Sequence, residues 1–402
     1  MKKAMVYIQS GGPTAVINSS LYGAIIEARK HPDLIGDIYG SIHGIEGLLN
    51  DDLIDLNKEE EKTIKLLKQT PGAALGSTRY KLPKDFHSEE HMRILNTLKK
   101  HNIGYVFING GNDSMDTAYK ISLLCEEKKY DCKVIGVPKT VDNDLALTDH
   151  SLGFGSAAKH IINTVQSIII DARSYRKSKI MVVEAMGRNC GWLAASVALL
   201  PDHLKPDLLY LPEQDFSTEQ FLKDVDRIYK EKGNVVAIVS EGLVFERDLS
   251  KAFVDSFNHV ELSGVASELA SLIREELGYP TRNIELSLPQ RANPILISKV
   301  DQEEAIACGK IAVQYALQGL SGIMVCIRRL SSDPYHVDYF PGDVGEIANA
   351  VKAIPESMIS NDEKLMDKSF IEYCLPLVLG HVDIEYLDGV YQAAVLKKVR
   401  VK

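Results

Sequence analysis

Six short apolar runs constrain the fold of this chain more than any other feature of the sequence. Each run ends in a glycine or polar turn and is followed by a helical pattern. The runs are AMVYIQSGG (4–12), GYVFINGG (104–111), KVIGVPKT (133–140), KIMVVEAMG (179–187), NVVAIVSEG (234–242) and GIMVCIRR (322–329). Continuous apolar strands that alternate with helices are typical of parallel sheets covered on both faces. The sequence therefore predicts an α/β fold.

With 402 residues, the chain is longer than the chains that usually fold around a single hydrophobic core. It predicts two or three domains, or two interleaved lobes. No Pro/Ser-rich linker, low-complexity tract or short repeat divides the chain. We therefore expect the chain to cross between its lobes more than once.

Charge and composition exclude several classes of protein. The formal charge of −9 argues against nucleic acid as a partner, because phosphate-backbone binding needs a basic surface. No segment approaches the roughly 18 continuous apolar residues of a membrane span. The basic opening MKKAMVYIQSGG is too short and polar for a signal peptide and is interpreted as a first strand. The six cysteines lack metal-binding spacing, which favours reduced, buried thiols in a cytoplasmic protein.

Two helices can be read directly from the sequence. Ser114 stands where an N-cap belongs before MDTAYKISLLCEEKK (115–129), in which Ala118, Ile121 and Leu124 mark one face. A second helix is expected over QEEAIACGKIAVQYALQGL (302–320), and it ends at a glycine. The first of these helices begins directly after an apolar run, which makes the turn between them a candidate ligand site.

In doubly wound sheets, ligands bind beyond the carboxyl ends of the strands. After the first run, Gly11 and Gly12 can free backbone N–H groups for an anion, although a simple tight turn explains them as well. After the second run, Asn112 and Asp113 lie at a helix N-terminus, where the dipole stabilises a carboxylate or a metal-bound phosphate. The alternative for this turn is ordinary helix capping.

The turn PKTVDND holds the densest cluster of candidate catalytic and metal-binding side chains. It places Lys139, Thr140, Asp142 and Asp144 within seven residues. In an extended chain, two acidic residues that are two positions apart point to the same side. This arrangement suits one of them to act as a general base and the other to bind a metal ion. Asp-Asn-Asp clusters also occur for turn geometry alone. The neighbouring lysine and threonine favour catalysis.

Cationic residues recur at the other turns and suggest phosphates at more than one position. Each single arginine is more often a solvated or salt-bridged surface residue. Glu241 ends a strand and is a candidate ligand for sugar hydroxyls, although it can be merely exposed. The cations are Arg79, Lys179, Arg188, Arg282 and Arg291.

The turns together resemble the phosphofructokinase family in order and spacing. The matching motifs are SGGPTAVIN, GSTR, GGNDS, PKTVDND, EAMGR, SEG and PQR, from residue 10 to about 330. The resemblance implies two Rossmann-like, three-layer lobes with mostly parallel sheets. Residues 1–155 with about 292–335 would bind the phosphoryl donor. Residues 156–291 with 336–402 would bind the sugar phosphate.

The resemblance also implies roles for individual residues. Members of the family phosphorylate the 1-hydroxyl of fructose 6-phosphate. Asp142 would be the base, beside Thr140, and Arg188 and Arg79 would stabilise the transferring group. Lys179 and Arg282 would reach in from a neighbouring subunit, which implies a homodimer or homotetramer with a shared active site. Contacts to the sugar phosphate are implied for Thr140, Val141, Asp142, Lys179, Met186, Gly187, Arg188, Glu241, Arg282, Leu288, Gln290 and Arg291.

Donor choice follows from two positions that are glycine in ATP-using members of the family. Here they are Asp113 and Lys139, as in the pyrophosphate-dependent branch. Gly11, Gly12 and Arg79 would complete the donor site. A carboxylate at Asp113 would repel the α-phosphate of ATP, while Lys139 would supply charge to a shorter donor. The expected donor is inorganic pyrophosphate, the expected cofactor is Mg²⁺, and the reaction is expected to be reversible.

The sequence differs from the motifs of the family at three places, and three alternative functions are considered beside the expected one. Asn112 replaces a metal-linked aspartate, so that Asn112 and Asp144 would hold the Mg²⁺ with less charge. Leu288 and Pro289 replace a more polar pair, and Ala-Asn-Pro follows Arg291 in place of a glycine pair. The rivals are an ATP-dependent member of the family, a catalytically silent regulatory paralogue, and an enzyme for another acceptor such as sedoheptulose 7-phosphate.

Overall fold

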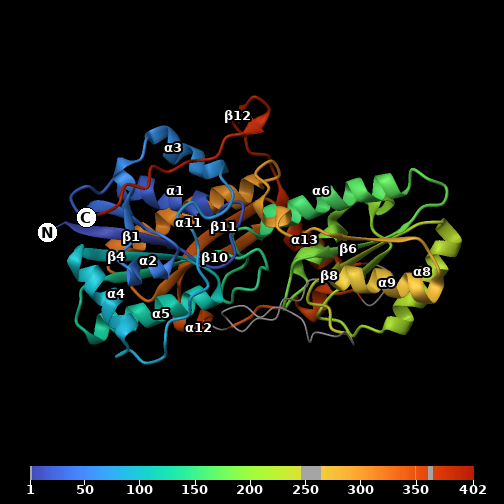
Figure 1. The fold of residues 1–402 in the computed structure, drawn as a ribbon, viewed down its shortest axis with the longest axis horizontal. Coiled ribbons are helices and arrows are strands. Elements are labelled where there is room, and N and C mark those ends of the chain that lie inside the picture. The colour runs from blue at the N-terminus through green and yellow to red at the C-terminus, as the bar shows by residue number, and fades with distance from the viewer. Residues whose placement is uncertain (1, 246–263, 349, 361–364) are drawn as a thin grey trace.

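The computed structural model describes residues 2–245, 264–348, 350–360 and 365–402, and it has two α/β lobes side by side (Figure 1). A seven-stranded sheet forms the first lobe and a four-stranded sheet the second. Helices cover both faces of each sheet, and α6 (Phe154–Ala172) runs from the junction along the second lobe (Figure 1). The expected α/β fold, with two three-layer lobes, is confirmed.

The first sheet has the order β11-β10-β5-β4-β1-β2-β3. Its inner pairs are parallel, while β3 and β11 run antiparallel at the two edges. The strands are β1 (Lys3–Gln9), β2 (Ile35–Ser41), β3 (Leu53–Asp55), β4 (Ile103–Gly110), β5 (Lys133–Pro138), β10 (Ile323–Ser332) and β11 (Tyr335–Asp343).

Burial on both faces explains why the inner strands are continuously apolar. In β1, Met5 and Tyr7 face one core, and Val6 and Ile8 face another. Successive side chains of a strand alternate between faces, so both sets of residues must be apolar. The helices of this lobe are α1 (Ile17–Ala28), α2 (Ile45–Leu49), α3 (Glu61–Leu66), α4 (Glu89–Lys100), α5 (Asn112–Glu127), α11 (Lys299–Leu317) and α12 (Val344–Ile347).

The second lobe repeats this arrangement on a smaller scale. Its sheet is fully parallel, with the order β7-β8-β6-β9. Met181 and Val183 of β6 face one core, and Ile180 and Val182 face the other. The strands are β6 (Ile180–Ala185), β7 (Leu208–Tyr210), β8 (Val235–Ser240) and β9 (Thr281–Glu285); the other helices are α7 (Trp192–Ala195), α8 (Thr218–Lys232), α9 (Val265–Leu277), α10 (Pro289–Ala292) and α13 (Lys368–Cys374).

All six apolar runs form strands, but the expected helix bounds differ from the structure. Gly111, not Ser114, is the N-cap of α5, because the N–H groups of Ser114 and Met115 both donate to the Gly111 carbonyl. The helix therefore begins at Asn112. Helix α11 begins at Lys299 and ends at Leu317, a shift of three residues from the expected bounds.

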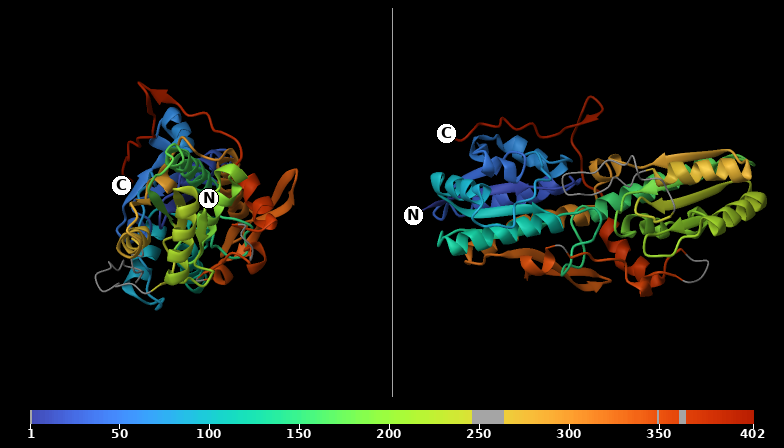
Figure 2. Two further views of the ribbon diagram at one scale, coloured as in Figure 1. Left: turned by 90° about the vertical axis from the view of Figure 1, so that its right-hand side faces the viewer. Right: turned by 60° about the horizontal axis from the view of Figure 1, so that its bottom comes forward.

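The expected C-terminal boundary at residue 335 also differs from the structure. Strand β11 pairs with β10 and extends the first sheet, whereas α13 packs in the second lobe. The tail then returns along the first lobe, where the Val401 N–H donates to the Leu53 carbonyl (Figure 2). On the way it forms the small hairpin of β12 (Tyr386–Leu387) and β13 (Val390–Tyr391). Within the described ranges, no helix is long and apolar enough to cross a membrane.

The packing of α1 against α11 in the first lobe depends on two glycines. A Cβ at Gly309 of α11 would lie 2.0 Å from the Ser20 carbonyl oxygen, and one at Gly23 of α1 would lie 2.2 Å from the Ile306 carbonyl oxygen. We expect Gly309→Ala to lower the free energy of unfolding by about 1–3 kcal/mol, because the helices must move apart. Urea denaturation measures the change, with the exposed Glu303→Ala in the same helix as the control; equal midpoints for the two variants would contradict this packing.

Candidate active site

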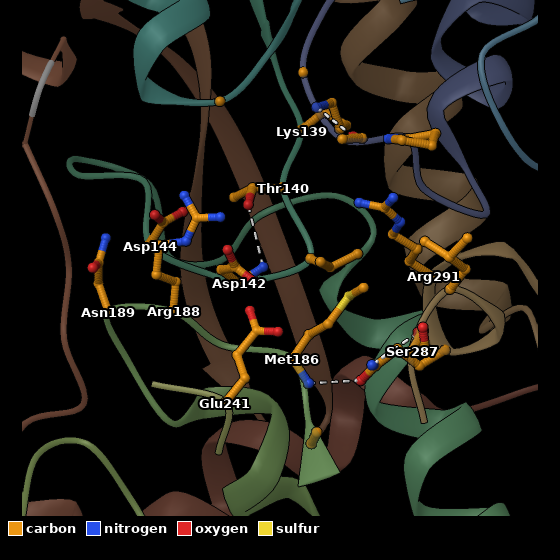
Figure 3. Close-up of a pocket in the computed structure, with 18 of the residues that line it drawn as sticks. Lys139, Thr140, Asp142, Asp144, Met186, Arg188, Asn189, Glu241, Ser287 and Arg291 are labelled. Atoms are coloured by element: carbon orange, nitrogen blue, oxygen red, sulfur yellow. Dashed lines mark hydrogen bonds between the residues drawn. The ribbon is translucent and has the colours of Figure 1, made fainter. Parts of the chain in front are cut away.

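A cleft of about 460 Å³ lies between the two lobes (Figure 3). Its walls are the turns after β1, β4 and β5 of the first lobe and after β6, β8 and β9 of the second. The sequence-predicted residues that line it are Gly11, Gly12, Arg79, Asn112, Asp113, Lys139, Thr140, Val141, Asp142, Asp144, Met186, Arg188, Glu241, Leu288, Gln290 and Arg291.

The PKTVDND turn brings both of its acids to the cleft by a route other than the one expected. Asn143 has a left-handed backbone (φ 57°), so the run from Asp142 to Asp144 is not extended. The Asp142 N–H donates to the Thr140 hydroxyl (3.2 Å), and the Ser151 N–H donates to the buried Asn143 side chain (2.9 Å). The turn is thus fixed by hydrogen bonds on both sides of Asp142.

The environment of Asp142 suits a general base. Burial raises its pKa to about 7, the neighbouring Asp144 and Glu241 carboxylates add to the shift, and Arg188 and Arg291 oppose it. Burial also raises the pKa of Asp144. A base is most effective when its pKa lies near the working pH. Arg188 and Asp142 both lie in the cleft, with Glu241 below them (Figure 3).

Lys139 fills the side of the cleft that the first lobe forms. Its Nζ donates to the Gly12 carbonyl (2.8 Å), and the residue is only 3% exposed. Burial, together with Arg291, lowers the pKa of Lys139 to about 7. A Cβ at Gly12 would lie 2.8 Å from Nη1 of Arg291, so the Arg291 guanidinium approaches the backbone of this turn closely.

Asp113 has a partner that sequence reasoning missed. The Nζ of Lys81 lies 3.7 Å from the Asp113 carboxylate, and both side chains are partly exposed. Lys81 follows the GSTR motif by two residues, but a lysine in a polar loop carries no signal of its own.

Asn112 and Asp144 offer a partial set of metal ligands. The Asn112 Oδ1 accepts from the Asp113 N–H (2.8 Å), and its Nδ2 donates to the Ala350 carbonyl (3.3 Å). No group of three or more His, Cys, Asp or Glu residues within the described ranges could hold a metal ion. Mg²⁺ is usually bound by one or two carboxylates, waters and substrate phosphates. Asp144 therefore fits such an ion, with Asn112 as a weaker, uncharged ligand.

The side of the cleft that the second lobe forms is held together by contacts between the turns after β6, β8 and β9. The Met186 N–H donates to Oε1 of Gln290 (3.0 Å), and the Gly187 N–H donates to Oε1 of Glu241 (3.3 Å). Gly187 does not line the cleft but shapes the turn between Met186 and Arg188. Its φ is 134°, and a Cβ added there would lie 2.4 Å from the Cys190 carbonyl oxygen, so this position requires glycine.

Several other residues that line the cleft were given no role in the site from the sequence. Glu184 lies inside the apolar run of β6, where burial raises its pKa to about 7, and it accepts the Ala266 N–H (2.9 Å) at the start of α9. Asn189 and Ser287 lie next to recognised motifs, and this proximity was the only indication in the sequence that they would line the cleft. The further lining residues are Pro13, Gly111, Ser114, Ala185 and Glu285.

Lys179 and Arg282 are not brought into this cleft. They line a separate hollow of about 760 Å³ with Tyr175 and Lys177. This hollow lies at the amino ends of β6 and β9, where Ile180 pairs with Thr281, while the cleft lies at the carboxyl ends. Within one chain these two cations lie at the opposite end of the sheet from Asp142.

Comparisons with known proteins agree with this geometry. The phosphofructokinase family model matches residues 4–316. The pyrophosphate–fructose 6-phosphate 1-phosphotransferase of Methylococcus capsulatus is 40% identical over 98% of this chain and 96% of its own length. A sulfofructose kinase of Alkalicoccus urumqiensis is 35% identical over 90% of this chain and 91% of its own. The crystal structure of the pyrophosphate-dependent phosphofructokinase of Marinobacter aquaeolei covers 100% of this chain and 98% of its own, with a TM-score of 0.90 and 38% identity. The chain belongs to the phosphofructokinase family.

Proposed function

We propose that the protein transfers a phosphoryl group reversibly from inorganic pyrophosphate to the 1-hydroxyl of fructose 6-phosphate. The products are fructose 1,6-bisphosphate and orthophosphate. The observation that carries the proposal is the buried Lys139, which occupies the donor side of the cleft together with Asp113. Relatives that are 40% identical over nearly the whole chain carry the name of this activity.

The residues of the cleft divide the chemistry among them. The Asp142 carboxylate takes the proton of the 1-hydroxyl of fructose 6-phosphate. The oxygen of that hydroxyl attacks the near phosphorus of pyrophosphate. The bond from that phosphorus to the bridging oxygen breaks, and orthophosphate leaves. Arg188, Arg79 and Lys139 stabilise charge on the transferring group, because phosphoryl transfer depends mainly on positioning and electrostatics. Mg²⁺, held by Asp144 and Asn112, would supply further charge neutralisation.

Initial rates with each donor test the proposal. Fructose 6-phosphate and Mg²⁺ are mixed with pyrophosphate or ATP, and formation of fructose 1,6-bisphosphate is followed. We expect turnover with pyrophosphate alone. Turnover with ATP alone would overturn the interpretation of Asp113 and Lys139. No turnover with either donor, despite binding of fructose 6-phosphate, would favour the regulatory paralogue. A faster rate with sedoheptulose 7-phosphate than with fructose 6-phosphate would reassign the acceptor.

We further propose a cytoplasmic homodimer or homotetramer in which Lys179 and Arg282 complete the cleft of a neighbouring subunit. Their position away from the cleft of their own chain supports this arrangement. The cysteines, all free and buried, support a reducing compartment. The protein is not expected to bind nucleic acid or a membrane.

A shared site makes a specific prediction for Arg282. We expect Arg282→Ala to raise the KM for fructose 6-phosphate about tenfold or more, because a charge-assisted hydrogen bond to phosphate is lost. Mixed oligomers of Arg282→Ala and Asp142→Asn should regain activity, since one of their sites receives both intact residues. Steady-state kinetics after dissociation and reassociation measure this. No recovery in verified mixed oligomers would contradict a shared site.

A further inference from the structure

A short segment after α12 crosses the catalytic turn. We call residues 350–354 the strap. It belongs to none of the sequence motifs, and along the chain it lies between α12 and α13. Its backbone joins the turn after β4, the turn after β5 and the second lobe, as the following contacts show.

Through its backbone, the strap contacts both of the residues that would hold Mg²⁺. The Ala350 carbonyl accepts from Nδ2 of Asn112 (3.3 Å), and the Lys352 N–H donates to the Asp144 carbonyl (2.8 Å). The Lys352 carbonyl accepts from the indole Nε1 of the buried Trp192 (3.0 Å). One residue of the strap is thus bonded to the catalytic turn on one side and to the second lobe on the other.

The side chain of Lys352 continues along the same loop. Its Nζ donates to the carbonyls of Thr148 (3.1 Å) and Asp149 (2.7 Å). It also lies 5.6 Å from the centre of the Trp192 ring, within range of a cation–π contact. With its backbone bond to Asp144, Lys352 therefore contacts three carbonyls between positions 144 and 149.

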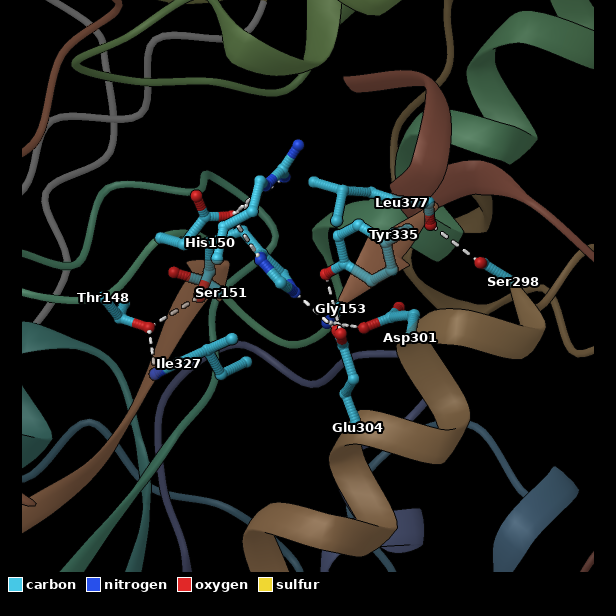
Figure 4. A network of polar contacts seen from close by, with 12 residues as sticks. Thr148, His150, Ser151, Gly153, Ser298, Asp301, Glu304, Ile327, Tyr335 and Leu377 are labelled. Atoms are coloured by element: carbon cyan, nitrogen blue, oxygen red, sulfur yellow. Dashed lines mark hydrogen bonds and ion pairs between the residues drawn. The ribbon is translucent and has the colours of Figure 1, made fainter. Parts of the chain in front are cut away.

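The rest of the loop is anchored by other residues. At its base, the Thr140 N–H donates to the Leu152 carbonyl (3.2 Å). Beyond position 149, the His150 ring is bonded to Glu304 (2.6 Å), and the Gly153 N–H donates to Asp301 (2.9 Å) (Figure 4). The stretch from 144 to 149 lies between these two anchors. At its far end it is also bonded to β10, where the Asp149 N–H donates to the Ile327 carbonyl (2.8 Å) and the Ile327 N–H donates to the Thr148 hydroxyl (3.0 Å), so Lys352 shares the hold on positions 148 and 149 and is the described contact to the Asp144 carbonyl.

We propose that Lys352 is a positioning residue for phosphoryl transfer, which holds the 144–149 stretch and thereby fixes Asp142 and Asp144 in the cleft. The ammonium group suits this role because it offers several donors to backbone carbonyls. Lys352 lies outside the lining of the cleft and acts through the loop. The inference rests on the proposed function for its kinetic effect, but the effect on loop order does not.

Kinetics should separate positioning from binding. A misplacement of about 1 Å can lower a rate about 100-fold, so we expect Lys352→Met to lower kcat about 10- to 100-fold. The KM for fructose 6-phosphate should change less than about twofold, because the sugar contacts come chiefly from the turns after β6, β8 and β9. Lys352→Arg retains N–H donors and should recover part of kcat.

The experiment combines steady-state kinetics with amide hydrogen exchange on the full-length protein. The matched control is Lys368→Met, since Lys368 is an exposed lysine of the same C-terminal region, and its ion pair with Glu372 lies on the surface. Rates are normalised to the folded fraction found by thermal melting. If Lys352→Met does not fold, Lys352→Gln takes its place. We expect faster exchange at residues 142–153 in Lys352→Met and no change in the control.

Each outcome decides the proposal. An unchanged kcat with unchanged exchange in the loop would overturn it. Equal losses in Lys352→Met and Lys352→Arg would assign the effect to packing and would also overturn it. If the wild-type protein has no pyrophosphate-dependent activity but exchange in the loop still accelerates, the proposed function fails while the role of Lys352 in ordering the loop stands.

Discussion

Asp142→Asn is expected to lower kcat by about 10²- to 10⁴-fold, the range typical of a lost general base. An amide occupies the same space as the carboxylate but cannot take the proton of the attacking hydroxyl. Binding of fructose 6-phosphate should persist, because the contacts among Met186, Gly187, Glu241 and Gln290 do not involve the Asp142 side chain. Initial rates in both reaction directions and calorimetric binding of the sugar phosphate measure the two effects.

The control for this variant is Asp383→Asn, which changes an exposed carboxylate outside the cleft. Its kcat should equal that of the wild-type protein. If Asp142→Asn retained more than about a tenth of the activity, the loss would be too small for a general base. The proton would then have to be taken by another group in the cleft.

Lys139→Met is expected to lower kcat/KM for pyrophosphate by about 10²- to 10³-fold, as when one preorganised donor to a developing charge is removed. The methionine keeps most of the stem but loses the ammonium group and its bond to the Gly12 carbonyl. Affinity for fructose 6-phosphate should be unchanged, because Lys139 lies on the other side of the cleft (Figure 3).

Lys133→Met provides the matched control for Lys139. Lys133 is at the opposite end of β5, where it pairs with Asp131 near the surface, so its loss should leave the kinetics unchanged. Equal kcat/KM values for pyrophosphate in Lys139→Met and the wild type would contradict the role of this lysine. Equal losses in both lysine variants would point to damage to the sheet.

The strands were predictable because their burial leaves a simple pattern. Inner strands such as β1 are covered on both faces and must be apolar throughout. Strand β11 left no such pattern, because it is an edge strand with partly exposed residues and contains Pro341. The expected lobe boundary therefore fell one strand too early. The start of α5 was missed because the Gly111 carbonyl begins the helix before Ser114 can cap it.

The turns of the site were predictable for a different reason. In parallel sheets the carboxyl ends of the strands meet, so polar residues there, such as Asp142, Arg188 and Glu241, converge. Lys352 lies in a stretch without periodicity or motif, and only tertiary packing brings it to the carbonyls of the catalytic loop. Glu184 was hidden within a strand, because a buried acid there resembles an irregularity in an apolar run.

The most direct measurement of the central claim is ³¹P NMR of the wild-type protein with pyrophosphate and Mg²⁺, with and without fructose 6-phosphate. Transfer to the sugar predicts one orthophosphate for each fructose 1,6-bisphosphate formed, and no loss of pyrophosphate without the sugar. Adding orthophosphate to fructose 1,6-bisphosphate should regenerate pyrophosphate. If pyrophosphate persists unchanged beside fructose 6-phosphate, or is hydrolysed to two orthophosphates without forming bisphosphate, the protein is not a pyrophosphate-dependent phosphotransferase.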